Sequence, residues 1–200
     1  MRESPLPGDV ASRLSGAKVG VAGLGGMGSH VAVALARSGI GTLVIADFDV
    51  VDGSNLFRQC YLPKDVGSRK TDALRETLSA IEPDIRIEVF DGRLDGDNAP
   101  GVFSDCEVVC ECLDQADQKA MLVESLLLGT GCTVVSCSGM AGFGSSNEIV
   151  TRKRMRRLYV CGDGVSEASE GPGLTAARVM VCAGHVANMA IRLLLGEDKP

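Results

Sequence analysis

Short apolar runs bounded by turn residues recur along this chain, and stretches with helical spacing separate them. The apolar runs lie at 18–23, 42–47, 85–90, 107–112 and 133–137. The helical stretches lie at 27–38, 68–81 and 116–128. Because strand and helix alternate, we predict an α/β fold with a doubly wound, Rossmann-like and mainly parallel sheet.

The pattern loosens after residue 137. Residues 138–146 are rich in glycine and serine and predict a loop, while 147–151 and 158–160 are expected to pair as a short antiparallel extension. Residues 162–173 are polar and glycine-rich, which indicates a mobile segment. The run 174–195 is apolar around most of its circumference, so we expect a buried C-terminal helix. With no internal repeat or long linker, residues 1–200 are interpreted as one domain.

Composition narrows the class of partner. The chain has 200 residues, of which 45% are hydrophobic and 23% charged, as in an ordinary globular protein. Its net charge of −6 disfavours a general nucleic-acid surface. One exception is the basic run 152–157, with five positive charges in six residues. We favour a solvated loop there, and the alternative is a patch that attracts an acidic partner or a phosphate.

Other features argue against export and against structural metal. No apolar run approaches the roughly 18 residues that span a bilayer, and residues 1–15 lack an apolar signal core. We therefore expect a soluble cytoplasmic protein without membrane contact. The eight cysteines include no C-x-x-C pair, so a zinc site of the usual spacing is unsupported. Most of them are interpreted as small buried apolar groups.

A glycine-rich turn carries the first chemical signal. Gly23, Gly25 and Gly28 follow the first predicted strand and open the first predicted helix, and Asp47 closes the second strand. This is the G-x-G-x-x-G fingerprint with an acidic residue about 20 positions later. Glycines let the backbone approach a phosphate, the helix N-terminus attracts it, and the carboxylate suits ribose hydroxyls. The turn therefore predicts a nucleotide site.

Four further polar residues follow strand ends that this sheet would bring together. Asn55, Arg58 and Lys70 come after the second strand and offer phosphate donors, although isolated cations on loops are usually solvated. Asp114 follows the fourth strand, where a carboxylate could hold Mg²⁺ against phosphate oxygens. The alternative for Asp114 is an N-cap of the next helix.

Together these motifs resemble one family. The segments 23–29 (GLGGMGS), 47–49 (DFD), 54–59 (SNLFRQ) and 67–70 (GSRK), followed by Asp114, have the order and spacing of the ThiF/MoeB superfamily. Its members are adenylating domains related to ubiquitin-activating enzymes. Segments 138–147, 161–163 and 173–176, with Glu111 in place of the more usual Asp, most resemble the short ThiF-type enzymes of thiamine biosynthesis. The resemblance covers nearly the whole chain.

The resemblance implies ATP-dependent adenylation of the C-terminal glycine carboxylate of a small β-grasp (ubiquitin-like) sulfur carrier protein ending in Gly-Gly, with release of pyrophosphate. Asp47 would bind the ribose and Asp114 would position Mg²⁺. The nucleotide would lie along the turn at Gly23, Gly25, Gly26 and Gly28. Its phosphates would be held by Asn55, Arg58 and Lys70. Segment 162–173 and the basic run are candidate carrier-binding elements.

The sequence departs from the family pattern in places. Phe57 stands where the N-L-x-R-Q motif usually has a polar residue. Relatives often supply an N-terminal arginine across a homodimer interface, and Arg2 and Arg13 are the candidates. Some relatives use a transfer cysteine, for which Cys161 is a weak candidate.

Three alternatives remain open. A tRNA threonylcarbamoyladenosine dehydratase of the same superfamily would need a broad basic surface, which a pI near 5.0 disfavours. An NAD-dependent dehydrogenase would explain the glycine turn and leave Arg58, Lys70 and Asp114 without a shared role. A non-catalytic nucleotide-binding scaffold would tolerate the loss of Asp114.

Overall fold

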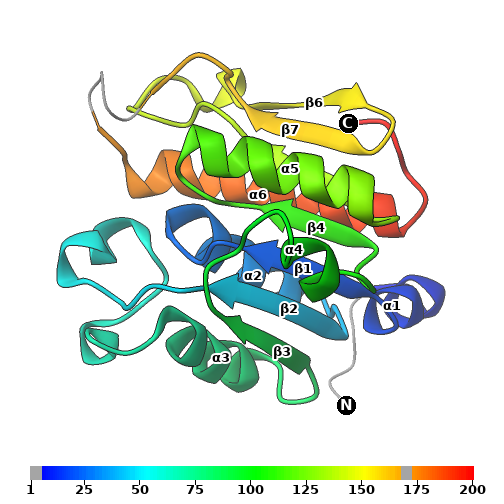
Figure 1. Ribbon diagram of the computed structural model, residues 1–200, viewed down its shortest axis with the longest axis horizontal. Coiled ribbons are helices and arrows are strands. Elements are labelled where there is room, and N and C mark those ends of the chain that lie inside the picture. Colours follow the sequence, from blue (N-terminus) through cyan, green and yellow to red (C-terminus); the bar gives the residue numbers. More distant parts are fainter. Residues whose placement is uncertain (1–5, 168–172) are drawn as a thin grey trace.

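A seven-stranded sheet forms the centre of the protein. The computed structural model describes residues 6–167 and 173–200, and its strands lie in the order β3-β2-β1-β4-β5-β7-β6 (Figure 1). The strand bounds are β1 Lys18–Ala22, β2 Thr42–Asp47, β3 Arg86–Asp91, β4 Val108–Glu111, β5 Thr133–Cys137, β6 Val150–Met155 and β7 Leu158–Gly162. All neighbouring pairs are parallel except β6 with β7. The predicted doubly wound sheet with an antiparallel extension is confirmed.

Strand order reverses at β1, which has β2 on one side and β4 on the other. In such sheets the loops that leave adjacent strands at this point diverge and open a crevice at the carboxyl ends of the strands. We call this end of the sheet its carboxyl side and the opposite end its amino side. The glycine turn follows β1, so it lies at the crevice.

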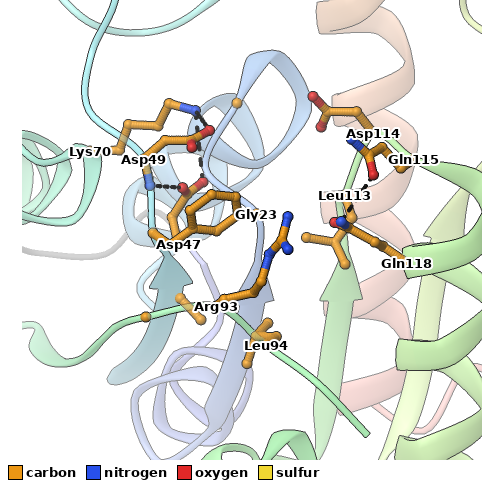
Figure 2. Close-up of a pocket in the computed structure, with 14 residues that line it drawn as sticks. Gly23, Asp47, Asp49, Lys70, Arg93, Leu94, Leu113, Asp114, Gln115 and Gln118 are labelled. Carbon is orange, nitrogen blue, oxygen red and sulfur yellow. Dashed lines mark hydrogen bonds and ion pairs between the residues drawn. The ribbon is translucent and has the colours of Figure 1, made fainter.

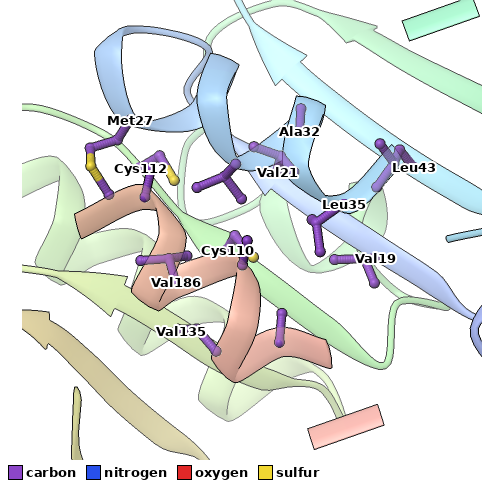
Figure 3. Packing of buried hydrophobic residues seen from close by; sticks show 14 of the residues in the cluster. Val19, Val21, Met27, Ala32, Leu35, Leu43, Cys110, Cys112, Val135 and Val186 are labelled. Carbon is purple, nitrogen blue, oxygen red and sulfur yellow. The ribbon is translucent and has the colours of Figure 1, made fainter. Parts of the chain in front are cut away.

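Helices cover both faces of the sheet. The longer ones are α2 (Gly26–Arg37), α3 (Lys70–Ile81), α5 (Ala116–Gly129) and α6 (Ala176–Leu194). The helices α2, α3 and α6 pack on one face, where Val19, Leu35, Cys110 and Val186 share a buried cluster (Figure 3). On the other face, α5 and the short α4 (Ala99–Val102) bury a second cluster around Phe103. Two separate cores thus hold the sheet rigid beneath the crevice.

The C-terminal helix is buried, as predicted. By length and composition its 19 residues could cross a membrane, which corrects the expectation that no stretch is long enough. Nine of its residues, among them Cys182 and Met189, are buried. The helix packs against α2 and against the strands β4 and β5. A helix that packs in this way is part of the core, and its apolar composition follows from that position.

Several elements were not predicted. Helix α1 (Gly8–Ser15) begins after Pro7, with Asp9 in its first turn and Arg13 in its last, which suits the helix dipole. The 3₁₀ helices η1 (Gly53–Arg58) and η2 (Pro63–Asp65) lie in expected loops, and η3 (Ser146–Glu148) replaces the start of the strand expected at 147–151. Short elements of this kind contain too few apolar positions to show a period.

The basic run is the clearest error in the predicted elements. Instead of a solvated loop between short strands, residues 152–155 form most of β6, and only 156–157 make the turn into β7. Charged side chains are typical of an edge strand, because they keep its unpaired side from joining other strands. The turn lies on the amino side of the sheet, with the C-terminus nearby (Figure 1).

Candidate functional site

A cleft of about 220 Å³ opens on the carboxyl side, where β1, β2 and β4 end (Figure 2). Its lining combines the glycine turn with residues that follow three other strands. The lining residues are Gly23, Gly25, Ala46, Asp47, Phe48, Asp49, Lys70, Gly92, Arg93, Leu94, Leu113, Asp114, Gln115 and Gln118. Of the predicted site, the cleft thus gathers Gly23, Gly25, Asp47, Lys70 and Asp114.

The turn needs its glycines for stereochemical reasons. Gly23 has φ of +86°, and a Cβ there would lie 2.8 Å from the carbonyl oxygen of Cys112. A Cβ on Gly28 would lie 1.7 Å from the carbonyl oxygen of Gly23, so the helix can approach the turn only without a side chain. Gly25 precedes α2 without a side-chain cap. The first N–H groups of a twelve-residue helix are therefore available to an anion.

Asp47 braces the turn. Its Oδ2 accepts a hydrogen bond from the Leu24 N–H at 2.6 Å, and its Oδ1 accepts one from the Asp49 N–H at 2.8 Å. The carboxylate is only 8% exposed, yet it lines the cleft. Each oxygen still has a lone pair for a hydroxyl of a ligand. The brace fixes the distance between the turn and the end of β2.

Lys70 is not the isolated donor that the sequence indicated. Its Nζ lies 2.8 Å from Asp49 Oδ2 and 4.0 Å from Asp47 Oδ2, and the residue is 7% exposed. The ammonium therefore neutralises two carboxylates on one wall of the cleft. Asp49 is the more exposed of the two carboxylates, with its side chain 48% exposed. A bound phosphate would share this cation with Asp49.

Asp114 stands on the opposite wall (Figure 2). Among the described residues its carboxylate accepts no hydrogen bond and forms no ion pair, and the N-cap position of α5 is Gln115, whose side chain does not cap. The N-cap interpretation of Asp114 is therefore wrong. An exposed, unpaired carboxylate facing a helix N-terminus across a cleft fits Mg²⁺ held jointly with phosphate oxygens. No cluster of three or more His, Cys, Asp or Glu that could hold a metal occurs in 6–167 or 173–200.

Arg58 and Asn55 lie outside the cleft lining. Both belong to η1, and the Arg58 Cγ lies 3.4 Å from where a Cβ of Gly26 would be. The Arg58 guanidinium stacks over the ring of Phe57 with its Cζ 4.9 Å from the centroid, and Phe57 is 58% exposed. The unusual Phe57 thus supports the arginine beside the start of α2. No hydrogen bond or ion pair joins the Asn55 side chain to the described cleft residues.

A buried layer supports the turn from below. The Tyr61 hydroxyl donates to the Leu24 carbonyl at 2.8 Å, and burial raises the pKa of Tyr61 so that it remains a donor. Gln59 is 8% exposed, and its Oε1 has no partner among the described residues. Its Nε2 comes within 4.0 Å of where a Cβ of Gly25 would be. A buried orphan acceptor at this point is a place for a ligand or a water molecule.

Among the lining residues that sequence reasoning missed, Arg93 and Phe48 stack on each other. Arg93 follows β3, and its guanidinium carbon lies 5.0 Å from the centre of the Phe48 ring, which is 40% exposed. Figure 2 shows the Arg93 side chain reaching into the cleft between the two walls. The sequence contained a signal for both residues. Phe48 follows the predicted strand 42–47, Arg93 follows the predicted strand 85–90, and parallel strands end on one side of a sheet.

A buried ion pair underlies the wall that carries Asp114. Glu111 is fully buried and accepts hydrogen bonds from the Leu113 N–H at 2.7 Å, from Lys119 Nζ at 3.0 Å and from the Ser136 hydroxyl. Burial alone would lower the pKa of Lys119, but Glu111 and Cys137 outweigh it and raise this pKa. The pair fixes the loop in front of α5, and thereby Asp114.

A second ion pair orders the loops at the far side of the cleft. Arg178, which is 5% exposed, donates to Asp163 Oδ2 at 2.7 Å and to Glu148 Oε2 at 3.2 Å. Burial alone would raise the pKa of Asp163, but the N–H groups of Ser166 and Val165, with Ser166 Oγ and Arg178, hold it well below its usual range. The predicted mobile segment therefore starts with an anchored turn, and its residues 168–172 lie outside the described ones.

The basic run and Arg13 both lie on the amino side of the sheet. In the basic run, Arg157 donates to the backbone carbonyls of Leu127, Thr130 and Cys132, and Lys153 pairs with Asp198. This turn lies on the side of the sheet opposite the cleft, which argues against its guiding a carrier tail. Arg13 pairs with Glu107, also on the amino side, and Arg2 lies outside the described residues.

Cys161 is a poor candidate for acyl transfer. It is fully buried, and burial raises its pKa to about 12. Among the eight cysteines only Cys60 is partly exposed. The prediction that most cysteines are buried is confirmed, and the burial of Cys161 removes it as a transfer candidate.

Comparison with known proteins shows which family the chain belongs to. A sequence profile of the ThiF family matches residues 4–200. The chain is 30% identical over 198 residues to the sulfur carrier protein ThiS adenylyltransferase of Escherichia coli, covering 96% of this chain and 78% of that protein. It is 37% identical over 129 residues to the adenylyltransferase and sulfurtransferase UBA4 of Candida glabrata, covering 64% of this chain and 30% of that protein. The chain thus spans about a third of the length of the UBA4 proteins it matches.

The fold has a close structural counterpart. The crystal structure of E. coli tRNA N6-threonylcarbamoyladenosine dehydratase, TcdA, in complex with ATP superposes with a TM-score of 0.86. The match covers 95% of this chain and 90% of that one at 21% sequence identity. At this identity the likeness establishes a shared Rossmann-like fold.

Proposed function

The chain belongs to the ThiF family, and we propose that it is an adenylyltransferase that activates the C-terminal glycine carboxylate of a small ubiquitin-like sulfur carrier protein with ATP. One observation carries the proposal. An uncapped helix N-terminus, with Arg58 against its first residue, lies beside the cleft, Lys70 with two carboxylates forms one wall, and Asp114, which pairs with none of the described residues, faces them. This is an arrangement for a polyphosphate.

The proposed chemistry needs charge control more than acid–base catalysis. The attacking carboxylate is already ionised near neutral pH, so no general base is required. It must approach an anionic α-phosphate, and cations that neutralise this charge lower the barrier. Arg58 and the N–H groups of α2 bind and orient the phosphates, Lys70 adds charge, and Asp47 binds the ribose. Mg²⁺ held by Asp114 would neutralise phosphate charge when bound.

A carrier tail has a route to this site. The loops after β5 and β7 border the cleft side of the sheet and expose Phe143 and Val165, at 78% and 84% exposure. Exposed apolar side chains of this size are suited to contact with a protein partner. Glycines at the end of a carrier tail would pass between such loops without steric conflict.

The proposal extends to the pathway and the assembly. The likeness to the ThiS adenylyltransferase over nearly the whole chain supports a carrier of thiamine thiazole biosynthesis. A homodimer acting in the cytoplasm completes the proposal. Light scattering of the purified protein tests the dimer.

The activity is tested by ATP–pyrophosphate exchange with candidate carriers that end in Gly-Gly. We expect labelled pyrophosphate to enter ATP only when an intact carrier is present. The matched control is the same carrier without its last glycine, which removes the attacking group from its position. Exchange with none of the carriers contradicts the proposal.

Action on tRNA is the second candidate, because the TcdA fold matches so completely. It predicts binding of tRNA at the cleft. The net charge is −6, and the densest basic segment lies on the opposite side of the sheet. A filter-binding assay with total tRNA at moderate salt distinguishes the two, and we expect no retention.

A further inference from the structure

Cys60 and His30 form a thiol–imidazole pair beside the start of α2. The Cys60 Sγ lies 2.8 Å from His30 Nδ1, although the two residues are 30 positions apart. Cys60 is half-buried, and the other seven cysteines are buried. Nothing in the adenylation chemistry uses this pair.

The surroundings define which ring nitrogen carries the proton. His30 Nε2 lies 3.2 Å from the carbonyl oxygen of Arg58, which can only accept a hydrogen bond. Nε2 therefore carries the hydrogen in the neutral ring, and the lone pair of Nδ1 faces the thiol. Burial lowers the pKa of His30 and raises the pKa of Cys60, so the resting pair is a neutral imidazole with a neutral thiol. An imidazole held in this orientation can accept the thiol proton.

We propose that Cys60 is the reactive thiol of this protein and forms reversible mixed disulfides with small-molecule disulfides, with His30 as the proton acceptor. The proton of Cys60 moves to His30 Nδ1 as the sulfur attacks one sulfur of the disulfide. The S–S bond of the disulfide breaks, and the departing thiolate takes the proton from His30. One disulfide and one thiol yield one mixed disulfide and one thiol, so no further oxidant is needed.

The same pair connects this thiol to the phosphate-binding segment. Three hydrogen bonds hold residues 58–60 on α2, and His30 makes two of them. The third joins the Cys60 N–H to Ser29 Oγ at 3.2 Å. Within this segment the Arg58 side chain lies against Gly26, at the helix N-terminus.

A group attached to Cys60 Sγ removes the thiol hydrogen, so the hydrogen bond to His30 Nδ1 is lost. It thereby loosens the segment that carries Arg58 and Gln59, and nucleotide affinity falls. This coupling rests on the proposed function, whereas the reactivity of Cys60 does not.

The test uses the full chain and oxidised glutathione as the probe, with peptide mapping of the adduct. We expect the first adduct on Cys60, its loss in Cys60→Ser, and at least about tenfold slower formation in His30→Gln. Cys132 is the internal control, because its sulfur accepts a hydrogen bond from Thr130 Oγ1 at 3.0 Å but is buried and has no base. A first adduct on any other cysteine overturns the proposal, and equal rates in His30→Gln overturn the role of His30.

Nucleotide affinity is measured by calorimetry before and after modification. We expect the dissociation constant for ATP to rise by about tenfold, the effect of losing one or two hydrogen bonds, and to recover on reduction. Cys60→Ser should show no response to the disulfide. Unchanged affinity in the modified protein overturns the coupling. Failure of the unmodified protein to bind ATP counts against the coupling and the proposed function, and leaves the adduct as a separate result.

Discussion

Charged side chains on the two sides of the sheet differ in how they are paired. On the amino side, Arg13, Lys18 and Lys153 each form an ion pair with an acidic residue, and Arg157 is bound to three backbone carbonyls. In the cleft on the carboxyl side, Asp114 forms no ion pair with the part of the chain that the structure describes, and Arg93 stacks on the ring of Phe48. Both sides are rich in charge, and the carboxyl side places such groups around a cleft of about 220 Å³ that a ligand can enter.

The difference shows why charge density in a sequence is a poor guide to function. The basic run 152–157 is the densest cluster of positive charge in the chain, and the structure uses it to join an edge strand to its neighbours. The cleft, in contrast, combines single residues that lie far apart in sequence. What distinguishes a site is unsatisfied polar groups at a strand-end crevice.

The largest effect is expected from a substitution in the glycine turn that borders the cleft. Gly28→Ala should destabilise the protein by about 3 kcal/mol or more and abolish nucleotide binding, because its Cβ would overlap the Gly23 carbonyl. Gly184→Ala is the matched control, since it is also in a helix but has nothing within 4 Å of the added Cβ. It should stabilise by roughly 0.5–1 kcal/mol. Denaturant unfolding measures both, and similar effects of the two changes would contradict the steric account.

The next prediction compares the removal of one negative charge inside the cleft with the removal of one outside it. Asp114→Asn should lower pyrophosphate exchange by about 100-fold, because an uncharged amide loses most of its attraction for Mg²⁺, with stability within about 0.5 kcal/mol. Asp117→Asn is the control, because that carboxylate accepts a hydrogen bond from the Gln118 N–H at 2.9 Å and does not line the cleft. If both variants keep full exchange, Asp114 does not hold the Mg²⁺ that the reaction uses.

A third change tests the loops beyond the cleft. Asp163→Asn should destabilise by about 3 kcal/mol at pH 7, because it leaves the buried Arg178 without its nearest carboxylate. The pKa of Asp163 is lowered in the folded protein, so its contribution is complete above the ordinary pKa of about 3.9 and is lost as pH falls below it. The stability difference between wild type and variant should therefore shrink below about pH 4. A difference that stays constant with pH would refute the ion-pair account.

The smallest effects concern the amino side. Arg157→Ala should cost about 2 kcal/mol, because three carbonyls lose a donor. Its neighbours Arg154 and Arg156 make no hydrogen bond or ion pair with the described residues, so their alanine variants should change stability by about 0.5 kcal/mol or less. All three should leave carrier affinity unchanged, as measured by calorimetry. Weaker carrier binding in any of them would restore the basic run as a docking element.

The sequence was sufficient for the parts that depend on local periodicity and strand ends. Strands such as 42–47 and 133–137 were predicted with their bounds, and the fingerprint located Gly23 and Asp47. Lys70 was predicted as a phosphate donor, but its pairing with Asp49 depends on how η1 and α3 pack. The His30–Cys60 pair was equally invisible, because a loop must fold onto α2 before they meet. The strand predicted at 147–151 was placed too early, because β6 (Val150–Met155) runs into the basic run, where pairing with β7 rather than composition stabilises it.

The central claim is that the cleft directs a carboxylate to the α-phosphate of ATP. It is tested most directly by mass spectrometry of a Gly-Gly carrier after incubation with this protein, ATP and Mg²⁺, with the cleaved phosphate identified in parallel. The account predicts an AMP adduct on the carrier's last glycine and release of pyrophosphate. Cleavage to ADP and phosphate without an adduct would contradict it.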